Sequence, residues 1–247
     1  MNKVAFVTGV SRGLGESLAA ALLDGGWSVF GIGRTAPARL ARAGFELLRG
    51  DLADVAAVAA IAQAAMRAAA AREPARALLI NNAAVAGPVG RLGALHADEL
   101  ASSLLVNLVA PTALCNAFCN AFGAAGTERR IINISSGLAG RVIPGAALYS
   151  VGKCGMEMLT RALAADHAEA GFAAITLRPG IIDTQMQVFM RSRAEGDLPD
   201  VGMFRDFHDG GQLVAADRVA SVTIANLVER VIESGKTYNY ADLASAR

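Results

Sequence analysis

Seven short runs of apolar and β-branched residues alternate with longer helical patterns along this 247-residue chain. This alternation predicts right-handed β-α-β units, which build a parallel sheet covered by helices on both faces. The predicted strands span residues 3–9, 27–33, 45–51, 77–83, 130–136, 173–179 and 236–240. The helical patterns lie near residues 14–24, 53–72, 97–122, 150–170 and 217–234. We therefore expect an α/β chain with a doubly wound, seven-stranded parallel sheet.

One long segment interrupts this rhythm. Residues 185–213 follow the sixth predicted strand and have no clean helical or strand period. Doubly wound sheets bind ligands at the carboxyl ends of their strands, and long loops there often close over a substrate. We expect this segment to be a substrate lid. Because no Pro/Ser-rich linker divides the chain, we expect residues 1–247 to form a single domain.

The overall composition narrows the classes of partner. The chain is 53% hydrophobic and 18% charged, which supplies a large core and argues against disorder. The net charge is +1, and the basic and acidic residues are spread along the chain. This pattern indicates neither a nucleic-acid partner nor an anionic membrane surface. The amino-terminal run reads as a strand rather than a signal peptide, and we expect no apolar run to approach membrane-spanning length. Cys115, Cys119 and Cys154 read as reduced thiols, and neither they nor the histidines predict a metal site. We expect a cytoplasmic protein.

A glycine-rich turn closes the first predicted strand and opens the first helix. It reads TGVSRGLG at residues 8–15, with glycines at 9, 13 and 15. The glycines allow a tight turn and close approach of the backbone to a pyrophosphate, while the helix amino terminus offers free N–H groups. The alternative is a tight strand–helix connection without a ligand. The strand–turn–helix context favours a dinucleotide site.

The end of the second predicted strand discriminates between nicotinamide cofactors. A site for the unphosphorylated ribose places an acid there, whereas this chain has Arg34 and Thr35 and no acid before Glu46. Arg12 in the glycine turn is a second guanidinium that suits a 2′-phosphate. The alternative is that both arginines are solvated. We expect NADP(H).

Two further strand ends carry residues that suit a dinucleotide. Asp51 ends the third predicted strand, where a carboxylate can accept from an adenine amino group. Small residues at 81–84 end the fourth strand and would let the cofactor ribose approach. Ordinary turn chemistry explains either feature equally well on its own.

Tyr149 and Lys153 are four residues apart in a predicted helix and therefore share a face. A nearby ammonium lowers the pKa of a phenol from its ordinary value of about 10 and favours acid–base catalysis. Taken alone, the pair is more often a partly buried tyrosine beside a surface lysine. A second feature is Pro111, whose missing N–H leaves the carbonyl of Asn107 free for a water. A plain proline kink is the alternative there.

Taken together and in order, these motifs resemble the short-chain dehydrogenase/reductase family over nearly the whole chain. The motifs are TGxxxGxG at 8–15, NNAx at 81–84, Asn107, NISS at 133–136, YxxxK at 149–153 and PGxxxT at 179–184. Ala84 departs from the family, which usually has glycine there. The resemblance implies a Rossmann fold and hydride transfer between a nicotinamide and a carbonyl or alcohol.

The resemblance also implies a role for each catalytic position. Tyr149 would donate a proton to the substrate carbonyl oxygen, and Ser136 would hold that oxygen. Lys153 would lower the pKa of Tyr149 and bind the nicotinamide ribose, while Asn107 would hold a relay water. Ser135 is expected to be structural. The implied cofactor contacts are Gly9, Ser11, Arg12, Gly13, Leu14, Gly15, Arg34, Thr35, Asp51, Leu52, Asn82, Ala83, Ala84, Tyr149, Lys153, Pro179, Gly180, Ile182 and Thr184.

The stretch DTQMQVFMRS at 183–192, followed by FRDF and a GGQL turn, resembles the branch that holds sepiapterin and benzil reductases. Those enzymes reduce one carbonyl of a vicinal diketone or a side-chain carbonyl beside an aromatic ring. The expected substrate contacts are Leu138, Ile143, Met186, Phe189 and Met190. The alternative is that these side chains form the segment's own small core. We expect an NADPH-dependent carbonyl reductase whose small-molecule substrate is an aromatic vicinal diketone, reduced at one carbonyl, or a similarly bulky ketone.

Other functions within and outside this chemistry stay open. A 3-oxoacyl-carrier-protein reductase, or a sugar or steroid dehydrogenase, would share the catalytic residues. A non-catalytic NADP(H) sensor is disfavoured because Tyr149 and Lys153 are both present. The resemblance further implies a homodimer or homotetramer that pairs helices near residues 97–122 and 150–170.

Overall fold

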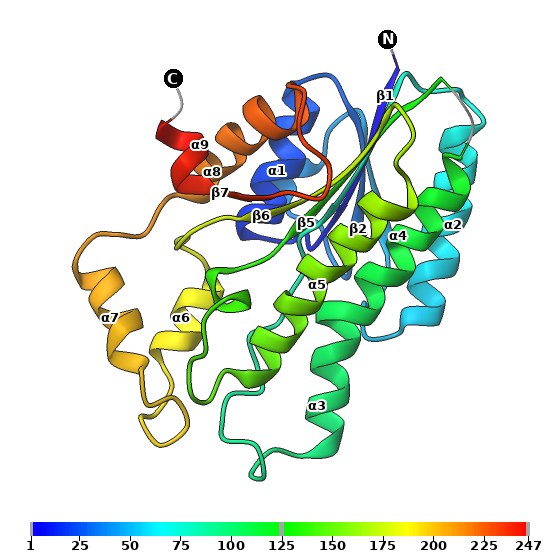
Figure 1. The fold of residues 1–247 in the computed structure, drawn as a ribbon. Coiled ribbons are helices and arrows are strands. Elements are labelled where there is room, and N and C mark those ends of the chain that lie inside the picture. Colours follow the sequence, from blue (N-terminus) through cyan, green and yellow to red (C-terminus); the bar gives the residue numbers. More distant parts are fainter. Residues whose placement is uncertain (1, 124–125, 246–247) are drawn as a thin grey trace.

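The structure is a computed structural model, and it describes residues 2–123 and 126–245. Its centre is a seven-stranded, wholly parallel sheet with strand order β3-β2-β1-β4-β5-β6-β7 (Figure 1). The strands are β1 (Lys3–Thr8), β2 (Ser28–Gly33), β3 (Phe45–Arg49), β4 (Arg76–Asn81), β5 (Glu128–Ile134), β6 (Phe172–Arg178) and β7 (Thr237–Asn239). The order reverses between β1 and β4, as in a doubly wound Rossmann fold, so the predicted fold class is confirmed.

Helices cover both faces of the sheet, as the near-continuous apolar strands predict. The helices are α1 (Gly13–Asp24), α2 (Val55–Ala70), α3 (Ala97–Leu104), α4 (Ala110–Ala121), α5 (Ala147–Asp166), α6 (Gln185–Arg191), α7 (Val201–Asp209), α8 (Ala216–Thr223) and α9 (Tyr240–Ser245). Successive strand residues point to opposite faces, so Ala5 and Val7 join a core under α1 and α8. Val4 and Phe6 join a second core under α2 and α4.

The expected single helix at 97–122 is wrong in detail. It is α3 and α4 joined by a π-helical turn, Leu105–Val109, with Pro111 in the first turn of α4. Proline has no N–H for an α-helical bond, and one wider turn accommodates it. The expected helix at 217–234 likewise ends early, because α8 passes into a second π-helical turn, Ile224–Val228.

The expectation that no run reaches membrane-spanning length is also wrong. The helical stretch Ala97–Ala121 has 25 residues and a mean hydropathy of 1.5, enough to cross a membrane by length and composition alone. In this structure the stretch packs against α2 and α5 beside the sheet (Figure 1). Core helices of folded proteins have the same composition, so this helix is weak evidence for a membrane.

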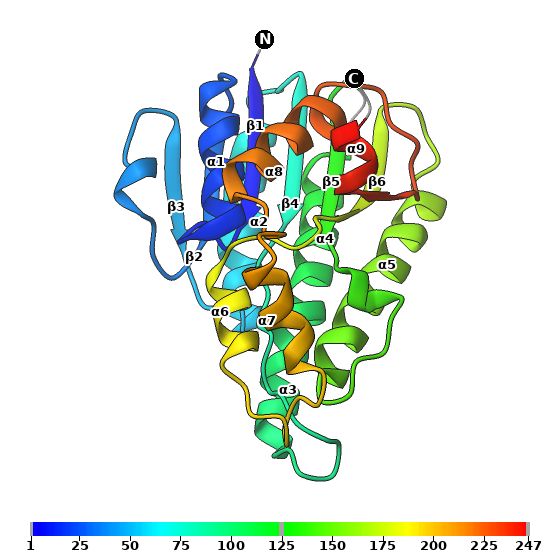
Figure 2. The same cartoon turned by 90° about the vertical axis from the view of Figure 1, so that its left-hand side faces the viewer.

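The 185–213 segment lies beyond the carboxyl ends of the strands, where Figure 2 shows α6 and α7 below the sheet. The sequence of this segment shows no single helical period because the segment forms two short helices that pack on each other. A short parallel bridge between Ile182 and Val214 joins the two ends of the segment. The segment is therefore anchored to the sheet end at a narrow neck.

Candidate active site

The glycine turn connects β1 to α1 and packs on the end of β4. Gly9 and Gly13 have φ values of 72° and 61°, which side chains rarely adopt. A Cβ on Gly15 would lie 2.2 Å from the Gly9 carbonyl oxygen, so the turn itself requires glycine there. Thr8 Oγ1 accepts hydrogen bonds from the backbone N–H groups of Asn82 and Ala83, each at 2.9 Å. The glycine turn at 8–15 and the motif at 81–84, both expected to contact the cofactor, are thus joined directly by hydrogen bonds.

The first turn of α1 fits an anionic group. The residue before it, Arg12, is extended and exposed, and its side chain makes no capping hydrogen bond. The amide groups of a 12-residue helix therefore meet the glycine turn without a side-chain cap. Leu14 and Leu52 are buried in the two cores, so only their backbone can face a cofactor. Ser11 is exposed in the same turn.

A third arginine joins the two that the sequence predicted. Arg34 and Thr35 are exposed after β2, and Arg49 Nη1 donates to the Arg34 carbonyl oxygen at 2.9 Å. Asp51 lies 4.0 Å from Arg34 Nη1. Sequence reasoning missed Arg49 because its alternation in β3 reads only as a solvent-facing strand position. The parallel pairing of β2 with β3, which sets Arg49 opposite Gly33, was the feature that could have placed Arg49 next to Arg34.

Tyr149 lies in the first turn of α5 and is half-buried. Burial raises the pKa of its phenol to about 12, while a side-chain hydrogen bond with Ser136 opposes the rise. Ser136 follows β5 and accepts a hydrogen bond from the Leu138 N–H at 3.2 Å. The predicted pair of Tyr149 and Ser136 is therefore brought together.

Lys153 is 3% exposed on the same face of α5. Its Nζ donates to the Ile134 carbonyl oxygen at 2.8 Å and lies 5.6 Å from the centroid of the Tyr149 ring. Burial lowers the pKa of Lys153 to about 8. The expected lowering of the Tyr149 pKa is wrong for the protein's own groups, because desolvation of the phenol is the larger effect.

Asn107 lies in the π-helical turn, against α5. Its Oδ1 accepts from the Val85 N–H at 2.9 Å, and its Nδ2 donates to the Val85 carbonyl oxygen at 2.8 Å. A Cβ on Gly152 would lie 2.9 Å from the Asn107 Cβ, so glycine lets α5 approach the turn closely. The side chain thereby links the chain just after Ala84 to the helix that carries Lys153.

The segment after β6 reaches back to the glycine turn. Pro179 is buried, and Gly180 has a φ of 77° and lies against the ring of Tyr240. Ile182 forms the bridge at the neck of the 185–213 segment. Thr184 precedes α6, and its Cγ2 lies 3.2 Å from where a Cβ on Gly13 would be. This contact places the segment after β6 against the glycine turn at the carboxyl ends of the strands.

The five expected substrate contacts gather in one small apolar cluster. Ile143 and Met190 are 2% and 5% exposed within it, as expected for a core of the segment itself. Leu138, Met186 and Phe189 are only partly buried and pack against it. These three keep apolar surface available at the end of the sheet that carries Tyr149.

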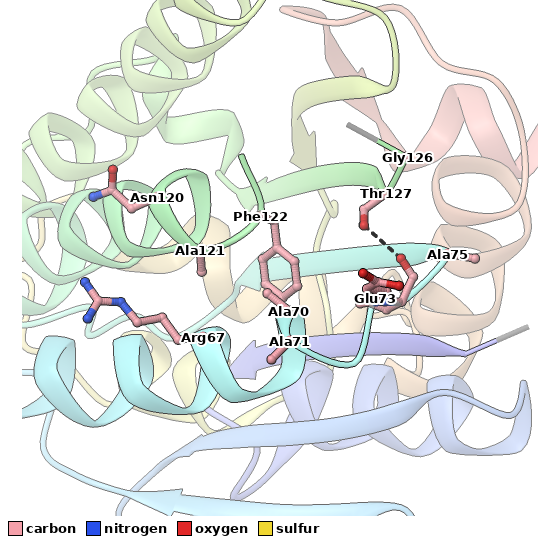
Figure 3. Close-up of a pocket in the computed structure, with 11 residues that line it drawn as sticks. Arg67, Ala70, Ala71, Glu73, Ala75, Asn120, Ala121, Phe122, Gly126 and Thr127 are labelled. Carbon is pink, nitrogen blue, oxygen red and sulfur yellow. Dashed lines mark hydrogen bonds between the residues drawn. The ribbon is translucent and has the colours of Figure 1, made fainter. Parts of the chain in front are cut away.

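A hollow elsewhere on the molecule lies away from this chemistry. Figure 3 shows it between the carboxyl-terminal ends of α2 and α4, with Arg67, Phe122 and Thr127 in its wall. Thr127 donates to the Pro74 carbonyl oxygen across it at 2.8 Å. This is the amino-terminal edge of the sheet, opposite to Tyr149. Within residues 2–123 and 126–245, no cluster of side chains is suited to hold a metal ion.

Comparison with known proteins agrees with the arrangement of these motifs. A family model described as short chain dehydrogenase matches residues 3–195. The chain belongs to the short-chain dehydrogenase family. Members of this family are oxidoreductases that act on CH–OH or C=O groups and bind a nicotinamide cofactor. The uncapped α1 amides and the glycine turn of this short-chain dehydrogenase fit such a dinucleotide.

Two relatives belong to the branch that the sequence resembles. The benzil reductase ((S)-benzoin forming) of Bacillus subtilis (strain 168) is 28% identical over 235 residues, which cover 94% of this chain and 96% of that protein. The sepiapterin reductase of Mus musculus is 30% identical over 172 residues, which cover 68% of this chain and 64% of that protein.

Among solved structures, this short-chain dehydrogenase is similar to a 3-oxoacyl-[acyl-carrier protein] reductase from Brucella melitensis in complex with NAD. The TM-score is 0.80 at 25% identity, covering 100% of this chain and 99% of that one.

Proposed function

We propose that this chain is an NADPH-dependent carbonyl reductase that acts on one carbonyl of an aromatic vicinal diketone or a similarly bulky ketone. The observation that carries the proposal is the arrangement of three side chains: the half-buried Tyr149 phenol is hydrogen-bonded to the Ser136 hydroxyl, and the Lys153 Nζ lies 5.6 Å from the centroid of the Tyr149 ring. A phenol placed beside a second hydroxyl and a cation can donate its proton to a carbonyl oxygen during reduction, because the cation favours the phenolate that remains.

The protein's residues would divide the chemistry between them. A bound nicotinamide cofactor supplies the hydride. Tyr149 would give its proton to the ketone oxygen, and Ser136 would stabilise the negative charge that develops there. Lys153 keeps its ammonium form beside the Tyr149 ring at neutral pH. It would return a proton to Tyr149 after the tyrosine has donated its own, and Asn107 would hold a water that relays protons to Lys153.

The choice of NADPH rests on charge at the end of β2. The exposed guanidinium groups of Arg12, Arg34 and Arg49 come from three neighbouring segments at one sheet edge. Guanidinium groups bind phosphate in a bidentate manner, whereas an acid in place of Arg34 would repel it. Asp51 accepts the Ala53 N–H with Oδ1 at 3.0 Å, and its exposed carboxylate would also accept from an adenine amino group.

The substrate class rests on the apolar cluster and on the relatives. Leu138, Met186 and Phe189 offer partly exposed apolar surface, and methionine adapts to varied shapes. A protein that is similar over 96% of its length is named a benzil reductase. We propose that the 185–213 segment closes over this substrate as a lid.

A second candidate is reduction of a 3-oxoacyl group on a carrier protein, in view of the similar Brucella melitensis reductase. The charge of the 185–213 segment argues against it. That segment carries Arg191, Arg193 and Arg205 but five carboxylates, at residues 195, 197, 200, 206 and 209. It therefore lacks the basic surface expected to receive an acidic carrier protein.

We also propose a cytoplasmic homodimer or homotetramer without a nucleic-acid or membrane partner. What supports assembly is an apolar stripe on the outer face of α5, defined by Val151, Cys154 and Met158, which are all exposed. Val109 in the π-helical turn is exposed as well. Exposed apolar side chains at this spacing are typical of a helix-pairing interface.

The decisive experiment measures NADPH consumption with benzil as the substrate. We expect the wild-type protein to turn over, and Tyr149→Phe to lower kcat about a hundredfold or more while NADPH still binds. Tyr238→Phe is the matched control, because that hydroxyl only accepts from the Glu233 N–H and should not affect kcat. Full activity of Tyr149→Phe would refute the mechanism. Binding of NADPH without reduction of any diketone would refute the substrate class.

A further inference from the structure

A third residue shares the face of α5 that carries Tyr149 and Lys153. Glu157 is four residues after Lys153, so the three side chains form one stripe at helical spacing. The side chain of Glu157 is 15% exposed. A largely buried carboxylate is costly unless it is paired and hydrogen-bonded, which makes its partners informative.

Glu157 is bound by two partners that come from neighbouring strands. Arg178 at the end of β6 donates from Nε to Oε1 at 2.7 Å and from Nη2 to Oε2 at 2.9 Å. The Ser135 Oγ, just after β5, donates to Oε1 at 2.9 Å. The carboxylate is therefore held by a planar bidentate pair and by a hydroxyl at the same time.

Each partner adjoins a residue of the candidate active site. Ser135 immediately precedes Ser136, and its backbone N–H donates to the Leu177 carbonyl oxygen at 2.8 Å. Arg178 immediately precedes Pro179, which begins the segment that leads to Thr184. The carboxylate of Glu157 thus fastens β5, α5 and β6 to one another where all three deliver site residues.

The same pair also reaches the loop that carries Leu138. A Cβ on Gly140 would lie 3.4 Å from Arg178 Nη2, so the guanidinium lies directly against the 137–140 turn. The Leu138 N–H in that turn donates to the Ser136 Oγ. A displacement of Arg178 would therefore be transmitted to the hydroxyl of Ser136 and to the start of the substrate wall.

We propose that Glu157 and Arg178 are positioning residues of this reductase, which fix the Ser136 hydroxyl and the Pro179–Thr184 segment relative to Tyr149 and Lys153. The proposal rests on the proposed carbonyl reduction. Neither residue touches a reacting atom. Their effect comes from geometry, since small misplacement of catalytic groups lowers the rate steeply.

The first test compares Glu157→Gln with a matched control, Glu169→Gln. Glu169 pairs with the buried Arg129 at 2.9 Å at the opposite end of β5, so both changes remove one partner of an arginine. We expect Glu157→Gln to lower kcat with benzil about tenfold or more, with the KM for benzil and the Kd for NADPH changed by less than about threefold. Glu169→Gln should keep the wild-type kcat.

Arg178 supplies a second pair of variants should Glu157→Gln not fold. Arg178→Lys keeps the cation but loses the bidentate geometry, and Arg178→Met loses both. We expect the kcat of Arg178→Lys to lie between that of Arg178→Met and that of the wild type. Equal kcat values in all folded variants would overturn the proposal, as would losses of NADPH affinity that match the loss of kcat.

A second readout needs no turnover. The amide of Leu138 is protected by the Ser136 Oγ, so its hydrogen exchange reports the position of that hydroxyl in the protein alone. We expect faster exchange at Leu138 in Glu157→Gln and wild-type exchange in Glu169→Gln. Unchanged exchange in Glu157→Gln would overturn the positioning role even if the wild type reduced no diketone, so the two failures are distinguishable.

Discussion

Tyr149 is half-buried and Lys153 is buried, and desolvation moves their pKa values in opposite directions. Burial raises the pKa of Tyr149 to about 12 and lowers that of Lys153 to about 8. In each case the neutral form is favoured, because a low-dielectric environment disfavours charge. The tyrosine therefore holds its proton firmly, and the lysine gives up its own more readily than an exposed lysine would.

The lysine shift predicts a pH dependence of stability. Between about pH 8 and pH 10.5 the unfolded chain keeps a proton on Lys153 that the folded protein has released. Raising the pH through this window therefore increases the free energy of unfolding. We expect the difference between the wild type and Lys153→Met to move by roughly 1–3 kcal/mol in favour of the wild type from about pH 8 to about pH 10.

Urea unfolding of both proteins across that range measures the effect. Titration of groups that do not interact with Lys153 cancels in the difference between the two proteins. Tyr149 acts in the opposite sense, and only above pH 10.0, the ordinary pKa of tyrosine. Because the pKa of Tyr149 in the folded protein is raised to about 12, the free energy of unfolding falls as the pH rises from 10 towards 12. A difference that stays constant with pH would show that Lys153 is not desolvated.

Arg34 governs the expected choice of cofactor. We expect Arg34→Asp to shift the preference from NADPH towards NADH, because a carboxylate repels a 2′-phosphate and accepts hydrogen bonds from a ribose. The ratio of kcat/KM for the two cofactors measures the shift. Arg39→Asp is the control, since Arg39 lies in the same β2–β3 connection but is paired with Asp217 of α8 at 2.9 Å. An unchanged ratio in Arg34→Asp would refute the assignment of this residue.

At the scale of elements, the α6–α7 segment is fastened at two places. Its neck is closed by the Ile182–Val214 bridge. Its far loop packs on Gly145, where a Cβ would lie 2.0 Å from the Asp197 carbonyl oxygen. Gly145 also has a φ of 85°, so both its conformation and its contact require glycine.

We expect Gly145→Ala to release the far loop of this segment. The added methyl group cannot fit against Asp197, so the loop must move away from the start of α5. Trypsin should then cut faster after Arg191 or Arg193, and the KM for benzil should rise. Gly202→Ala on α7 is the matched control, because a Cβ there meets nothing within 4 Å. Wild-type proteolysis of Gly145→Ala would contradict this role.

At the scale of the whole molecule, the outer face of α5 exposes two large apolar side chains that are two helical turns apart. Val151 and Met158 on the outer face of α5 are 55% and 57% exposed. The adjoining α3–α4 stretch is apolar enough to pass for a membrane helix. Apolar surface of this kind on a folded domain is typical of an interface with another chain.

We expect the double variant Val151→Glu/Met158→Glu to be monomeric and the wild type to sediment as a dimer or tetramer. Two carboxylates facing their copies across a symmetric interface repel each other and cannot be desolvated cheaply. Sedimentation velocity measures the outcome. Val231→Glu is the control, since Val231 is 99% exposed at the other end of the sheet and should not affect assembly. A monomeric wild type would refute the proposed assembly.

The sequence by itself determined the sheet, the glycine turn and the order of motifs. These depend on period and on local chemistry, such as the alternation of β1 residues between two cores or the lack of an N–H in Pro111. It also indicated that Tyr149 and Lys153 share a helix face, because helical spacing is local. The sequence did not predict the extra arginine, Arg49, or the two helices of the 185–213 segment.

Only the tertiary structure decided the properties that depend on what surrounds a residue. The pKa values of Tyr149 and Lys153 follow from burial by parts of the chain far apart in sequence, which no spacing reveals. Glu157 and Arg178 are 21 residues apart and meet only because the middle of α5 packs beside the carboxyl ends of β5 and β6. Periodicity specifies which face a side chain takes, whereas desolvation and pairing depend on the packed neighbours.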